Sequence, residues 1–115
     1  MSLSQKQCVP CEGGALPLSR EEASRYLCEL NPAWQLSDDA KKIRRDFTFA
    51  DFLSAMRFVT HVADLAEQEQ HHPDMMICYN KVAIELSTHA VKGLSENDFI
   101  LAAKIDMADI KWRQE

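Results

Sequence analysis

Two pairs of short alternating segments, each joined by a tight turn, restrict the folds open to this chain of 115 residues. The first pair covers residues 33–37 and 41–48, with serine and aspartate at the turn between them. The second pair covers residues 75–79 and 82–88, about Asn80-Lys81. Tight turns join antiparallel neighbours, because parallel strands need a longer crossover connection. The sequence therefore predicts a four-stranded antiparallel sheet.

Two helices alternate with the strand pairs. Ser19 and Glu22 have the spacing of a capping box, and the helix that they open should stop at Asn31-Pro32. Residues 48–51 resemble a second capping box, with Thr48 at the N-cap, and open the longest helix. This helix carries a wide apolar stripe and should run to about residue 71, because Pro73 disfavours the helical conformation at the residue before it.

A third capping box, Ser95 to Asp98, opens a last helix over about residues 96–112. The order α-β-β-α-β-β-α, with the three helices packed on one face of the four-stranded sheet, predicts an α+β fold. We expect residues 1–17 to form an irregular N-terminal extension and residues 18–115 to form a single domain. The last helix is apolar on more than one side, which favours a homo-oligomer, either a dimer or a tetramer.

The charge of the chain excludes some partners. The formal net charge is −5 and the pI is about 5.3, whereas nucleic-acid-binding proteins show a basic surface. No secretory leader pattern opens the chain, and no apolar run approaches the roughly 20 residues of a membrane helix. We expect a cytoplasmic protein that binds neither nucleic acid nor membrane.

Cysteine is too sparse for a disulfide scaffold. Cys28 and Cys78 lie in apolar-patterned segments, which predicts reduced thiols in the core. Cys8 and Cys11 have CxxC spacing, but no second CxxC and no nearby histidine pair accompanies them. A tethered N-terminal loop is favoured over a zinc or redox site.

Titratable residues gather between Glu67 and Asp98, a span that includes three of the four histidines, His71, His72 and His89. If the second helix reaches residue 71, Glu67 and His71 share one helical face as an i,i+4 pair, and the proline directs His72 elsewhere. Adjacent histidines point apart, so we expect no metal site. The spacing alone leaves a catalytic site and a polar helix end both open.

Several separated motifs carry a resemblance to a known family. The pattern Glu-x-x-x-His-His-Pro at residues 67–73, Tyr79, and Ser-Thr-His at residues 87–89 resembles pterin-4a-carbinolamine dehydratase. The similarity extends through Trp34 and over roughly residues 18–110. It further includes Asp46 to Phe49, Tyr79 to Val82 and Gly93 to Ser95.

The resemblance implies a four-stranded antiparallel sheet with helices on one face, and it implies a reaction. That reaction is the loss of water from a 4a-hydroxytetrahydropterin, giving quinonoid dihydropterin, during regeneration of the tetrahydropterin cofactor of aromatic amino acid hydroxylation. No metal or cofactor is required. The residues matching the family's site are Glu67, His71, His72, Ser87, Thr88, His89 and Asp98.

On this resemblance we expect His71 and His89 to transfer protons, because imidazole titrates near neutral pH. His72 would position the pterin or the departing water. Glu67 would accept hydrogen bonds from the pterin, and Asp98 would orient one imidazole, with Ser87 and Thr88 beside the ring. Two other classes stay open: a dimerisation or binding module that assists a transcription factor, and a pterin-site protein of molybdopterin metabolism.

Overall fold

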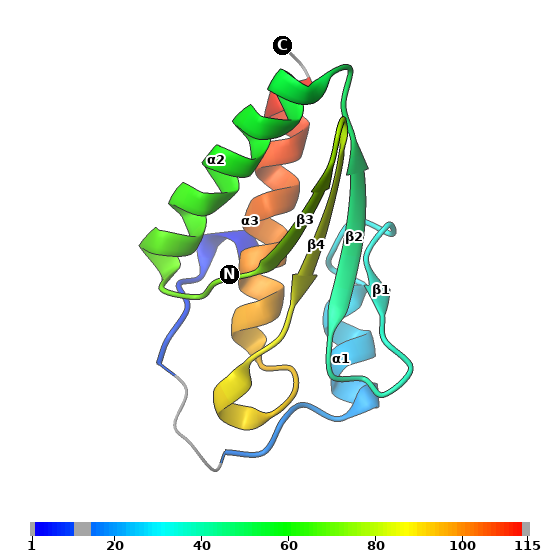
Figure 1. Cartoon of the computed structure of the whole chain (residues 1–115). Helices are drawn as coiled ribbons and strands as arrows, with labels where there is room; N and C mark the ends of the chain where they lie inside the picture. Colours follow the sequence, from blue (N-terminus) through cyan, green and yellow to red (C-terminus); the bar gives the residue numbers. More distant parts are fainter. Residues whose placement is uncertain (1, 11–14, 114–115) are drawn as a thin grey trace.

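A four-stranded antiparallel sheet in the order β1-β2-β4-β3 carries three helices on one face (Figure 1). The computed structural model describes residues 2–10 and 15–113. The predicted order α-β-β-α-β-β-α and the α+β class are confirmed. The helices are α1 (Arg20–Leu27), α2 (Phe52–Glu69) and α3 (Glu96–Arg113), the strands are β1 (Gln35–Leu36), β2 (Ile43–Thr48), β3 (Asp74–Cys78) and β4 (Lys81–Leu86), and two 3-10 turns are η1 (Leu3–Gln5) and η2 (His89–Val91).

Strands β2 and β4 form the centre of the sheet, and their side chains alternate between the core and the open face. Ile43 lies opposite Leu86 and Phe47 opposite Val82, and all four are buried. Because successive side chains of a strand point to opposite faces, this register gives the sheet one continuous apolar surface. The helices cover that surface.

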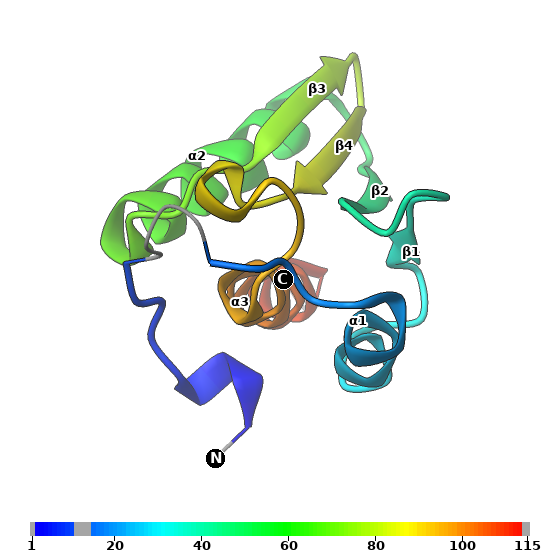
Figure 2. The same cartoon turned by 90° about the horizontal axis from the view of Figure 1, so that it is seen from below.

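Helix α3 is surrounded by the rest of the chain. Figure 2 shows it at the centre, between α2 and α1, with the N-terminal segment on the side away from the sheet. Phe99, Leu101 and Ile105 are fully buried, whereas Met107 is 58% exposed and Ile110 is 50% exposed. Neighbours within the chain thus cover most of the apolar surface that suggested a subunit contact. None of the described helices is both long and apolar enough to cross a membrane.

The second capping box is not formed as predicted. Thr48 is the last residue of β2 and pairs with Lys81, because the ladder between β2 and β4 extends that far. Asp51 is the N-cap of α2, and its side chain accepts a hydrogen bond of 2.8 Å from the backbone N–H of Ser54. The prediction of Thr48 as the cap is therefore wrong.

Two smaller differences concern helix and turn boundaries. Helix α1 ends at Leu27, and a turn carries the chain on to Leu30. The second hairpin turns at Tyr79 and Asn80, one residue earlier than predicted, with Tyr79 in the left-handed region at a φ of 52°. In both places the hydrophobic pattern located the element but not its end.

The predicted placement of two cysteines in the core is wrong. Cys28 and Cys78 are both exposed. Cys28 follows the end of α1, and Cys78 lies on the open face of the edge strand β3, opposite Lys81. By contrast Leu3, from the expected irregular extension, is only 3% exposed and packs in the core.

A buried ion network connects the sheet to α3. Arg45, on the core-facing side of β2, lies 2.6 Å from an oxygen of Asp106 and 3.2 Å from an oxygen of Asp109. Asp106 also accepts hydrogen bonds from the indole of Trp34 and the backbone N–H of Asn31. A buried charge is costly unless it is paired and hydrogen-bonded, so these partners make the arrangement tolerable.

Removal of Asp106 should therefore destabilise the fold strongly. We expect Asp106→Ala to lower the free energy of unfolding by about 3 kcal/mol or more, because Arg45 then loses its nearest carboxylate while still buried. Urea denaturation followed by circular dichroism measures this change. Asp46→Ala is the control, since its partner Arg44 lies on the exposed face, and it should shift the midpoint little. Equal shifts for the two variants would contradict a supporting role for the network.

Candidate active site

Helix α2 ends two residues earlier than predicted, and this places His71 outside the helix. Gln70 adopts the left-handed conformation at φ 52° and ψ 40°, and its backbone N–H donates to the carbonyl of Ala66. The backbone N–H of His71 also donates to Ala66. This is a C-terminal cap that turns the chain sharply before Pro73 is reached. The expected i,i+4 pairing of Glu67 with His71 is consequently wrong.

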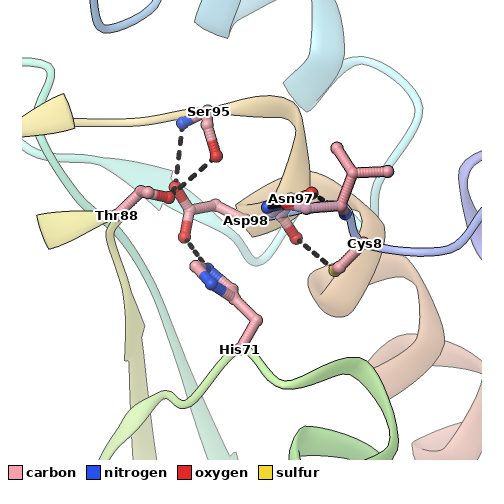
Figure 3. A network of polar contacts seen from close by, with 7 residues as sticks. Cys8, His71, Thr88, Ser95, Asn97 and Asp98 are labelled. Carbon is pink, nitrogen blue, oxygen red and sulfur yellow. Dashed lines mark hydrogen bonds and ion pairs between the residues drawn. The ribbon is translucent and has the colours of Figure 1, made fainter. Parts of the chain in front are cut away.

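His71 instead pairs with Asp98 at the start of α3. The Nε2 atom of His71 lies 2.6 Å from one carboxylate oxygen of Asp98, which is completely buried. The other oxygen accepts hydrogen bonds from the hydroxyl of Thr88 and the backbone N–H of Ser95, at 2.8 and 3.0 Å (Figure 3). The bond to Ser95 is the carboxylate arm of the predicted third capping box.

This pairing determines which nitrogen of His71 carries the proton in the neutral ring. A carboxylate only accepts hydrogen bonds, so Nε2 must donate to Asp98. The neutral imidazole then holds its lone pair on Nδ1, and that atom is the one that can accept a proton. Because the side chain of His71 is only 11% exposed, its orientation is well determined by its surroundings.

The second histidine of the motif forms a separate pair. The Nε2 atom of His72 lies 2.6 Å from a carboxylate oxygen of Glu67, and both side chains are largely exposed. The sequence predicted that the proline would direct His72 away from Glu67. The early end of α2 reverses that expectation, because the chain folds back beside the last helical turn.

His89 comes from a third element. It begins η2, directly after Thr88, and its side chain is exposed. Among the described residues its imidazole has no hydrogen-bond partner. Thr88, by contrast, is buried and bonds both Asp98 and the hydroxyl of Ser95. His89 therefore retains both ring nitrogens for a ligand.

These elements surround a pocket of about 450 Å³, a volume within the range of small-molecule sites. Five of the predicted site residues line it, namely His71, His72, Ser87, Thr88 and His89. Asp98 lies behind His71, and Glu67 lies outside the lining as the partner of His72. The remaining lining residues are Cys8, Val9, Pro10, Gln68, Glu69, Gln70, Ala90 and Asn97.

The N-terminal residues in this lining were missed by sequence reasoning. Asn97 bonds the backbone of Val9, a residue 88 positions away in the chain. No periodicity or motif marks such a contact, because it depends on where the N-terminus lies once α3 is in place. Asn97 itself falls inside the third capping box, a pattern that predicts only the start of the last helix.

The surroundings of Cys8 disfavour its reactive thiolate form. Burial, with a smaller contribution from the carboxylate of Glu69, raises the pKa of Cys8 to about 12. The thiolate is the form that binds metals and attacks electrophiles, so Cys8 by itself suits neither role at neutral pH. Its predicted CxxC partner, Cys11, lies outside the described residues. Among the described residues no group of three or more potential ligands could hold a metal ion.

The chain is similar to many known proteins. A family model described as Pterin 4 alpha carbinolamine dehydratase matches residues 16–108. A Nitrosomonas eutropha protein named "Putative pterin-4-alpha-carbinolamine dehydratase" is 51% identical over 105 residues, covering 91% of each chain. A Halorhodospira halophila protein of the same name is 47% identical over 106 residues, covering 92% of this chain and 96% of the relative.

Two solved structures share the fold. The crystal structure of a transcriptional coactivator/pterin dehydratase from Brucella melitensis superposes with a TM-score of 0.75 and 35% identity, covering 80% of this chain and 97% of that one. A pterin dehydratase-like RuBisCO assembly factor of the alpha-carboxysome superposes with a TM-score of 0.58 and 21% identity, covering 66% and 88% of the two chains. At that identity the second comparison shows the fold alone.

Thiol labelling tests the environment of Cys8. At pH 8 iodoacetamide should modify Cys28 and Cys78 readily, because both are exposed, and should leave Cys8 largely unmodified. Peptide mass spectrometry of the digested protein measures each rate separately. Labelling of Cys8 should accelerate as urea unfolds the chain. A Cys8 rate in the native protein as fast as that of Cys28 would contradict the raised pKa.

Proposed function

Because this chain belongs to the pterin 4 alpha carbinolamine dehydratase family, we propose that it removes water from a 4a-hydroxytetrahydropterin. One observation carries the proposal: three histidines from two segments, the loop after α2 and the start of η2, line one pocket, and His71 is held by the buried Asp98. The product is quinonoid dihydropterin. The reaction belongs to the regeneration of the tetrahydropterin cofactor used in aromatic amino acid hydroxylation.

The chemistry requires two proton transfers. The C4a–O bond breaks while the lone pair of N5 forms a C4a=N5 double bond. The departing hydroxyl gains a proton and leaves as water, and N5 loses its proton. No electron is exchanged, so the step requires no oxidant or reductant. A pair of imidazoles can supply one proton and accept the other near neutral pH.

We assign these transfers to His71 and His89. His71 is supported as the base by its bond to Asp98, which leaves Nδ1 as the acceptor and stabilises the imidazolium that forms. His89 is supported as the acid by its exposure and by its unpartnered ring among the described residues. Positioned proton transfer of this kind typically contributes about 10²–10⁴-fold to the rate.

His72 and Glu67 take supporting roles in the same proposal. His72 lines the pocket and would hold the pterin or the departing water, with Glu67 fixing its ring through the 2.6 Å contact. For Glu67 to bind the pterin directly, as the resemblance implies, that contact would have to be exchanged. Ser87 lines the pocket beside Thr88 and would offer its hydroxyl to the ring edge.

We further propose that the protein is a cytoplasmic homo-oligomer. Support for self-association comes from apolar side chains left exposed: Met76 and Ile77 on the edge strand β3, and Met107 and Ile110 on α3.

A binding module is the second candidate function. It is favoured by the similar Brucella melitensis protein, which is described as a transcriptional coactivator as well as a pterin dehydratase.

A direct assay tests the proposed reaction. The protein is mixed with freshly generated 4a-hydroxytetrahydrobiopterin, and formation of quinonoid dihydropterin is followed by absorbance. We expect the dehydration to run well above its spontaneous rate. A rate equal to that of the spontaneous reaction would remove the enzyme function and favour the binding module.

Histidine variants test the assignment within the site. His71→Ala and His89→Ala should each reduce kcat by about 10²-fold or more, because each removes one positioned proton-transfer group. His61→Ala is the matched control, since His61 lies on α2 outside the lining of this pocket. Circular dichroism verifies that all three variants fold. Full activity in both folded site variants would refute the assignment.

A further inference from the structure

Residues 3–10, here called the N-terminal strap, are held against the body of the protein at several points. Leu3 is buried in the core, and Lys6 lies 3.1 Å from a carboxylate oxygen of Glu96. The backbone N–H of Cys8 donates to a carboxylate oxygen of Glu69 at 2.7 Å, and its thiol donates to the carbonyl of Asn97. The strap therefore has a defined path from the core to the pocket.

Asn97 makes the contact that matters most for the pocket. Its side-chain oxygen accepts from the backbone N–H of Val9 at 3.0 Å, and its side-chain nitrogen donates to the carbonyl of Val9 at 2.6 Å. The amide thus satisfies both backbone groups of one residue, as a neighbouring strand would. Asn97 is only 5% exposed, so its orientation is well determined. An aspartate could not donate to the carbonyl of Val9.

The strap offers contact surface rather than proton-transfer groups. Cys8, Val9 and Pro10 line the pocket, and Val9 is 65% exposed. Valine and proline do not ionise, and the thiol of Cys8 stays protonated because burial raises its pKa to about 12. The titratable histidines all come from the other sides of the pocket, after α2 and after β4.

We propose that residues 8–10 form a substrate-binding wall for the pterin, and that Asn97 is a positioning residue that holds this wall in place. The inference rests on the proposed function for the identity of the ligand. The faces of a pterin ring are flat and less polar than its edges, so an apolar side chain is a suitable neighbour. The family model's match begins at residue 16, so this wall comes from outside the region matched.

The strap supplies binding contacts and the histidines supply proton transfer, so changes in the strap should affect KM, whereas changes in the histidines should affect kcat. Loss of the wall removes binding contacts and leaves the acid/base groups in place, which should raise KM and leave kcat nearly unchanged. We expect Asn97→Ala to raise KM about tenfold, equivalent to about 1.4 kcal/mol. Val9→Ala keeps the strap in place and trims only an exposed side chain, so it should fold normally and raise KM about threefold.

A matched control comes from the opposite end of the sheet. The side chain of Asn80 donates to the backbone carbonyl of Phe49 at 2.8 Å and does not line the pocket. Asn80→Ala removes the same kind of side-chain to backbone bond and should leave KM unchanged. Labelling of Cys8 by iodoacetamide provides a readout independent of activity: it should accelerate in Asn97→Ala, because the strap detaches, and stay slow in Asn80→Ala.

The experiment measures KM and kcat in the dehydration assay, the Kd for 7,8-dihydrobiopterin by fluorescence, and the labelling rate of Cys8. We expect KM and Kd to rise in Asn97→Ala and Val9→Ala while kcat stays constant. We also expect bound dihydrobiopterin to slow the labelling of Cys8. Unchanged KM and Kd in Asn97→Ala despite fast labelling would overturn the inference, since the strap would then be only structural.

Failure of the inference can be told apart from failure of the proposed function. If the wild-type protein binds dihydrobiopterin without accelerating dehydration, the enzyme assignment fails, while the Kd values of the variants still decide the binding wall. If the wild-type protein neither binds the pterin nor accelerates dehydration, both proposals fall together. If the wild-type protein binds the pterin and accelerates dehydration, and Asn97→Ala and Val9→Ala keep its KM and Kd, the binding wall alone is overturned.

Discussion

The site depends on the hydrogen bonds that the buried carboxylate of Asp98 accepts. This carboxylate connects three segments that are distant in the chain: the start of α3, the loop after β4 through Thr88, and the loop after α2 through His71. A carboxylate with no exposed surface needs hydrogen-bond donors within the protein. Asp98 has three: the hydroxyl of Thr88, the backbone N–H of Ser95 and the imidazole of His71. Satisfying this one group therefore brings the pocket walls together.

The same group connects stability with chemistry. As a capping residue, Asp98 fixes the first turn of α3, and as a partner of His71 it selects the tautomer with its lone pair on Nδ1. Its neighbour Asn97 faces the other way and holds the backbone of Val9. The first turn of α3 thus supports the histidine side of the pocket and the strap side with consecutive residues.

The fold could be predicted to a large extent, because its signals are local. Alternation in residues 82–86, the capping box at Ser19 and the long apolar stripe of α2 each depend on nearby residues, and each element formed. The residues at which helices and strands begin and end were less predictable. The capping pattern predicts Thr48 as a helix cap, but Thr48 joins β2, since a ladder continues as long as its partner strand offers hydrogen bonds. Arg45 shares the core-facing side of β2, and only the positions of Asp106 and Asp109 explain how its charge is accommodated.

The sequence by itself determined the element order, the α+β class and the residues from which a site could be made, because these follow from periodicity, capping and motif. Tertiary structure decided the partners. His71 pairs with Asp98 and His72 with Glu67, whereas helical spacing predicts that Glu67 shares a face with His71, because Gln70 ends α2 in a left-handed turn. It also brought the strap to the pocket through Asn97, a contact between residues at opposite ends of the chain. Long-range contacts of this kind depend on the assembled fold and leave no local pattern in the sequence.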